Sequence, residues 1–254
     1  MVTPRAPQVT QARVRVSTKT LIQAVKSLTN EQRKWVKHSG FGHLLNFSIS
    51  LIPKEVACKL LWTVDTNDLA IKLDEKTIHI SDADVQRVLG FPRGERAVTL
   101  TNDVNELTSW HNEFKNIMPS RIKNSDILDK IRTEQTASPH FKRNFLLLVA
   151  NTLISPTKDA NTHKELAFFS GDWDSLSEYN WCAYVLANLK RSVETWKSDP
   201  TKDFTGPLLF IVVSITMSPL QFKRINMILM VLIIFFFTFL PAPVFRPYQQ
   251  YDLP

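Results

Sequence analysis

The chain has 254 residues, enough for one large domain or two small ones with a sizeable hydrophobic core. Hydrophobic residues make up 44% and charged residues 22%, which is the composition of an ordinary globular protein and excludes a low-complexity one. Only 6 glycines are present, which argues against a glycine-rich phosphate-binding loop. The net charge of +7 permits a nucleic-acid or anionic-lipid partner, but the basic residues are scattered, so a nucleic-acid partner stays unsupported.

The first 28 residues contain basic side chains and no acid. The basic residues are Arg5, Arg13, Arg15, Lys19 and Lys26. We interpret residues 1–28 as a flexible basic leader. The alternative is an organellar transit peptide, which shows the same lack of acids. A compact domain is then expected over residues 29–213.

Capping and turn signals predict a mostly helical domain. Thr29 is a candidate N-cap for the first helix, which the glycines of residues 39–42 end. Ser81 and Asp84 resemble a capping box, and Gly90 is a suitable stop for the helix that they begin. Further helices are expected over residues 53–64, 102–115, 125–135, 138–154 and 176–196.

Two segments alternate apolar and polar residues, LAIKL (69–73) and TIHI (77–80), with DEK between them. This pattern predicts a β-hairpin. The apolar run from Phe145 to Ala150 is too continuous for a surface helix, so we expect that helix at the centre of the core. The expected fold class is therefore mainly α: a helical globular domain with a small β-hairpin, followed by a C-terminal hydrophobic helix.

No motif predicts a catalytic or metal site. Cys58 and Cys182 lie in apolar, helix-like runs, which indicates buried side chains in a reducing compartment rather than a disulfide or a nucleophile. Arg93 and Arg96 flank Gly94 and could hold a phosphate, although a solvated turn is the simpler interpretation. We predict that the chain is not an enzyme, with no catalytic, cofactor-binding or metal-binding residues and no cofactor.

Two other features have structural interpretations. Asp82 and Asp84 lie at a predicted helix start, where the helix dipole favours acids. The six tryptophans are spread through the predicted elements, so core packing is expected for them. Only Trp196, which is next to Lys197, suggests a surface on which bases could stack.

Residues 214–254 form a separate hydrophobic tail, in which residues 227–240 read MILMVLIIFFFTFL without a charge. At 1.5 Å per residue this run covers ~21 Å, and residues 225–245 cover ~31 Å, the thickness of a bilayer core. Its apolar side chains contribute on the order of 3 to 7 kcal/mol towards insertion. We predict one spanning helix over residues 225–245; a buried core helix is the alternative.

The charges beside the tail predict its orientation. Lys223 and Arg224 precede the hydrophobic run, and Arg246 alone follows it. The positive-inside rule then places the large domain in the cytosol. A second apolar stretch, residues 206–217, is shorter and holds Pro207, so we expect it in the core or as a marginal second segment.

Several segments together resemble the plant transposon-derived proteins in which an N-terminal helical domain precedes a Ulp1-like cysteine protease. These proteins are related to the aminotransferase-like plant mobile domain. The similarity covers roughly residues 31–213. The segments that carry it are FGHLLNFSISLIPKEVACKLLWTVD (41–65), IHISDADVQRVLGFPRGERAV (78–98), FLLLVANTLISP (145–156), YNWCAYVLANLKRSVETWK (179–197) and GPLLFIVV (206–213).

The resemblance implies a noncatalytic interaction domain and carries over no functional residue, because the family's protease half supplies its chemistry. We expect a membrane protein anchored through residues 225–245. The alternative is a truncated, soluble nuclear member of the family that lacks the protease half. The tail departs from the family pattern, and a retained intron would produce the same departure, because T-rich noncoding sequence encodes Phe, Leu and Ile.

Overall fold

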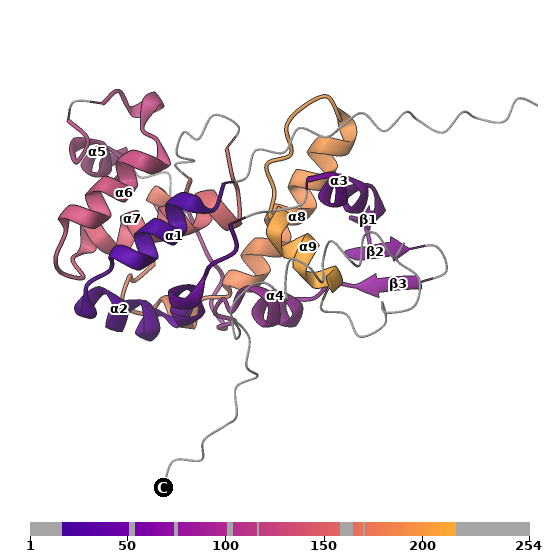
Figure 1. The fold of residues 1–254 in the computed structure, drawn as a ribbon, viewed down its shortest axis with the longest axis horizontal. Coiled ribbons are helices and arrows are strands. Elements are labelled where there is room, and N and C mark those ends of the chain that lie inside the picture. The colour runs from indigo at the N-terminus through magenta and orange to yellow at the C-terminus, as the bar shows by residue number, and fades with distance from the viewer. Residues whose placement is uncertain are drawn as a thin grey trace, which may run out of the picture. The chain divides into compact units, whose positions relative to one another are not determined.

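The computed structural model describes residues 17–50, 54–73, 76–100, 104–115, 117–157, 165–169 and 171–216. By its internal contacts the chain divides into two units, residues 1–214 and 215–254. The described residues are mainly helical with one small antiparallel sheet, as predicted (Figure 1). None of the helices in these ranges has the length and apolar character that crossing a membrane requires. The predicted spanning helix, residues 225–245, lies outside the described residues.

The longer helices are α1 (Lys19–Ser27), α2 (Asn30–Val36), α3 (Lys54–Thr63), α4 (Asp82–Leu89), α5 (Val104–Asn112), α6 (Asn124–Thr133), α7 (Pro139–Leu153), α8 (Trp181–Ser198) and α9 (Leu208–Thr216). Short helical turns cover Lys37–Phe41, Gly42–Asn46, Pro119–Arg121, Glu165–Phe168 and Leu176–Glu178. The strands are β1 (Val64–Asp65), β2 (Ala70–Leu73) and β3 (Lys76–His79).

The prediction of a flexible leader over residues 1–28 is wrong from Lys19 onward, because α1 belongs to the packed domain. Leu21, Ala24 and Leu28 are buried, and α1 contacts α6 and α7. These residues recur with the period of a helix, so one face of α1 is apolar. The lack of acidic residues concerns only the exposed face of α1, so it gave no indication of the buried apolar face.

Local signals placed the start of α2 and the end of α4 correctly. The Gln32 N–H donates to Thr29 Oγ1 at 3.3 Å, and the Thr29 N–H donates to Gln32 Oε1 at 3.0 Å, which closes a capping box. Gly90 ends α4 with φ at 66°, in the left-handed region that favours glycine.

The predicted hairpin is present, and a third strand extends it. Strand β2 pairs antiparallel with β3, so that Ile71 lies opposite Ile78. Strand β1 pairs with the other edge of β2, where Val64 lies opposite Ile71. Val64 was predicted as the end of a helix; instead α3 stops one residue earlier and the chain turns into the sheet.

Helix α7 is the centre of the core, as predicted. Every residue from Arg143 to Leu153 is buried. Helix α8 begins at Trp181 rather than near residue 176, because Asn180 caps it: the Ala183 N–H donates to Asn180 Oδ1 at 2.8 Å. The apolar side chains Cys182, Val185, Leu189 and Val193, which recur along α8 at helical spacing, are buried, and so are residues 206–213, which places this part of the second apolar stretch in the core.

Candidate functional site

Arg93 and Arg96 lie in the loop after α4 and pair with carboxylates at the start of α4 and in the turn before α8. The Arg93 Nε lies 2.9 Å from Asp82 Oδ2, and this guanidinium holds the pKa of Asp82 below its usual range. The Arg96 Nη1 lies 3.1 Å from Glu178 Oε2. Both arginine side chains are about half exposed. They lie in a solvated turn and bind carboxylates of the chain, which accounts for them without a phosphate.

Both cysteines are buried, as predicted, and neither forms a disulfide. The Cys182 Sγ donates to the carbonyl oxygens of Phe91 at 3.3 Å and Pro92 at 3.4 Å. Burial raises the pKa of the Cys182 thiol to about 12. This thiol is therefore protonated at neutral pH and is a poor nucleophile.

The suggestion of a base-stacking surface at Trp196 and Lys197 is wrong. The Trp196 ring is buried against Trp62, with the ring centroids 4.7 Å apart. The Lys197 Nζ donates to the carbonyl oxygens of Trp62 at 3.2 Å and Val64 at 2.6 Å. The ammonium group thus binds carbonyl oxygens at the end of α3, where the helix dipole favours a cation.

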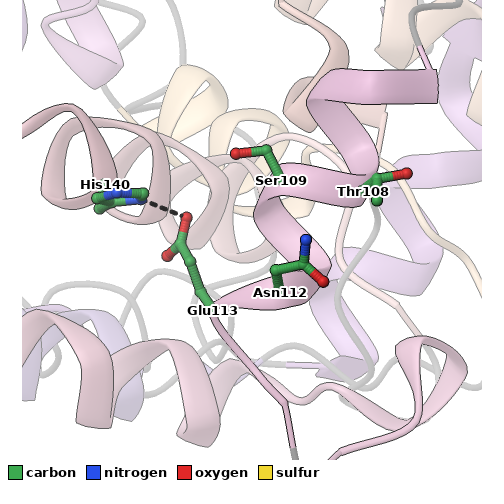
Figure 2. Close-up of a pocket in the computed structure, with 5 residues that line it drawn as sticks. All are labelled: Thr108, Ser109, Asn112, Glu113 and His140. Carbon is green, nitrogen blue, oxygen red and sulfur yellow. Dashed lines mark hydrogen bonds and ion pairs between the residues drawn. The ribbon is translucent and has the colours of Figure 1, made fainter.

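A polar hollow of about 480 Å³ lies where the end of α5 meets the start of α7 (Figure 2). Its lining residues are Thr108, Ser109, Asn112, Glu113 and His140. Figure 2 shows Ser109 and Glu113 on the side of α5 that faces His140. Thr108 and Asn112 lie one helical turn apart, and so do Ser109 and Glu113, so each pair shares one side of the end of α5.

Glu113 is the centre of a hydrogen-bonded cluster at this hollow. Its Oε1 accepts from His140 Nδ1 at 2.7 Å and from Arg143 Nη2, and its Oε2 accepts from Asn144 Nδ2 at 2.8 Å. Asn144 Oδ1 in turn accepts from Trp110 Nε1 at 2.9 Å. These bonds join α7 to both the last turn of α5 and the residue after it.

The start of α7 puts three of these donors in reach of Glu113. The Ser138 hydroxyl caps the helix by accepting from the Phe141 N–H at 3.2 Å. His140, Arg143 and Asn144 then follow at the spacing i, i+3 and i+4, which shares one helix face. Arg143 and Asn144 are buried, whereas the side chain of His140 is 58% exposed.

The cluster fixes the tautomer of His140. Glu113 accepts from a guanidinium and from an amide, so it is the acceptor in the bond to the imidazole as well. We therefore assign the proton to Nδ1 of His140. In the neutral ring, Nε2 is then a hydrogen-bond acceptor.

Sequence reasoning missed this site because its halves lie about 30 residues apart. A signal was present in HFKRN, residues 140–144, where polar residues recur on a helix whose remainder is apolar. Buried polar side chains need partners. That requirement could have flagged Arg143 and Asn144. Within the described ranges no group of three or more His, Cys, Asp or Glu side chains could hold a metal ion.

A family model described as a domain of unknown function (DUF8566) matches residues 14–212. The chain belongs to this family. The match takes in α1, in agreement with the corrected start of the domain, and ends within α9. No curated protein and no solved structure matches the chain. The whole polar hollow lies inside the DUF8566 domain.

Proposed function

We propose that this DUF8566 domain is a noncatalytic interaction domain and that the polar hollow is its binding site. The observation that carries the proposal is the Glu113 carboxylate, which three side chains of α7 hold in place. A lining that is fixed before a ligand arrives loses little conformational entropy on binding. The buried, protonated thiol of Cys182 supports the noncatalytic part.

The experiment is a screen of small polar fragments against the full chain, followed by backbone amide chemical shifts. We expect the shifted resonances to cluster at the end of α5 and the start of α7. We also expect every fragment to be recovered chemically unchanged. Binding at another surface would overturn the assignment of the hollow, and conversion of any fragment would overturn the noncatalytic function.

We also propose that the hydrophobic tail anchors the domain in a membrane, with the domain on the cytosolic side. The uncharged run over residues 227–240 supports this proposal. Deleting residues 221–254 should release the protein from the membrane fraction into the supernatant. An unchanged distribution between the fractions would rule out the anchor.

A soluble nuclear protein of the plant transposon-derived family is the alternative to the anchored form. The five segments that resemble this family support that origin. Sequencing the transcript across codons 205 to 250 distinguishes the two forms. Splicing within the hydrophobic stretch would favour the soluble nuclear form, whereas retention of the stretch would favour the anchor.

A further inference from the structure

We infer that the polar hollow binds an uncharged ligand rich in hydroxyl groups, namely a sugar unit. This inference rests on the proposed role of the hollow as a binding site. It follows from three properties of the lining: which of its groups can accept or donate, what net charge the lining carries, and how open the hollow is.

The lining offers fixed acceptors that the ligand must match with donors. His140 Nε2 accepts when the ring is neutral, since Nδ1 donates to Glu113. A carboxylate has about four acceptor sites, and three of those on Glu113 are occupied, so Oε2 can accept one more bond. A ligand hydroxyl can donate to either atom.

The remaining lining groups can serve as donor or acceptor. Ser109 contributes a hydroxyl and Asn112 a carboxamide, and both side chains are exposed. A sugar hydroxyl also donates and accepts, so neighbouring hydroxyls can bind the fixed acceptors and these two groups at once. A site whose amide and hydroxyl groups bind ligand hydroxyls in this way discriminates strongly against ligands that lack those hydroxyls.

The charges of the cluster cancel, which disfavours an ionic ligand. The carboxylate of Glu113 lies against the guanidinium of Arg143, and both side chains are about nine-tenths buried. The charges of this pair sum to zero. An anion would meet the carboxylate oxygens of Glu113, and a cation would find the carboxylate of the lining already paired with Arg143.

The hollow is large and open enough for a sugar. Its volume of about 480 Å³ falls within the range of ordinary small-molecule sites. Figure 2 shows the side chains of Ser109 and Glu113 on the side that faces His140. The exposure of His140, 58% for its side chain, leaves Nε2 accessible to a ligand.

The test titrates the full chain with three probes of different charge: methyl α-D-glucopyranoside, inorganic phosphate and ethylammonium. Backbone amide shifts of residues 108–113 and 140 report binding. We expect saturable shifts with the glucoside only. Saturable shifts at these residues with phosphate or ethylammonium alone would overturn the sugar assignment but leave the hollow as a binding site.

The variant His140→Asn separates binding from folding. The asparagine amide can still donate to Glu113, whereas the Nε2 acceptor is lost. We expect glucoside affinity to fall roughly tenfold, the value of one hydrogen bond, with unchanged stability. The same change at exposed His79, on β3, is the matched control and should leave the affinity unaltered. Unchanged affinity in His140→Asn, or no saturable shift with the glucoside at all, would overturn the inference.

Discussion

At the residue scale, Asn144 joins the two buried ends of the Glu113 cluster. It donates to Glu113 and accepts from the indole N–H of Trp110, whose side chain is fully buried. Asn144→Ala leaves that N–H and one carboxylate oxygen without their partners. We expect a loss of about 2 to 4 kcal/mol in the free energy of unfolding, measured in urea. Asn112→Ala, on the exposed side of the same hollow, should lower the free energy of unfolding by about 0.5 kcal/mol or less. Equal losses in the two variants would contradict the claim that the bonds of Asn144 stabilise the fold.

The thiol of Cys182 makes a prediction about pH. Its pKa is raised from 9.0 to about 12, so the folded state favours the protonated thiol. This contribution to stability is complete below about pH 9 and is lost as the pH rises towards 12, with a slope on the order of 1 kcal/mol per pH unit. Urea unfolding between pH 8 and 10.5 should show a steeper fall for the natural chain than for Cys182→Ala. Parallel slopes would contradict the burial of this thiol.

At the element scale, the sequence correctly predicted the helix ends that depend only on neighbouring residues. Thr29, Ser138 and Gly90 lie where their predicted helices begin or end, because a cap acts within four residues of itself. Elements that depend on distant partners were missed. Strand β1 exists only because Val64 pairs with β2, and the start of α8 shifts because Asn180 bonds across to Asp82 and caps the helix.

Gly90, at the end of α4, lies close to His43 in the turn at residues 42–46. Its φ is 66°, and a Cβ there would lie 2.4 to 2.7 Å from atoms of the His43 side chain. Gly90→Ala should therefore cost about 1 to 3 kcal/mol of unfolding free energy. Gly42→Ala is the matched control, since its Cβ would meet Lys37 at 3.4 Å or more and its φ is −55°. A control that costs as much as Gly90→Ala would show that the conformation of Gly90 is not the cause.

At the scale of the whole molecule, capping and turn signals predicted a mainly helical domain, but the lack of acids near the N-terminus misplaced its start. Helix α1 was hidden in a segment without acids, although Leu21 and Val25 are buried against the rest of the domain. The candidate site was missed for a related reason: Glu113 and His140 meet only after α5 and α7 pack. Short-range patterns identify faces and caps, whereas the pairing of faces depends on the complete fold.

Two shortened chains measure the contribution of α1. A chain that starts at residue 17 retains α1, and one that starts at residue 29 lacks it. Because Leu21, Ala24 and Val25 would leave the core, we expect the second chain to be less stable by about 3 to 6 kcal/mol in urea. If the two chains are equally stable, α1 does not stabilise the domain, and the original prediction of a flexible leader over residues 1–28 would stand.

The central claim is that the polar hollow is where this DUF8566 domain binds its ligand. The most direct test is the affinity of the strongest-binding fragment for Ser109→Trp, in which an indole fills the hollow from the exposed side of α5. Ser198→Trp, at the exposed end of α8, is the control for adding a tryptophan. We predict that Ser109→Trp abolishes the chemical-shift changes and that Ser198→Trp retains them. Undiminished affinity in Ser109→Trp would contradict the claim.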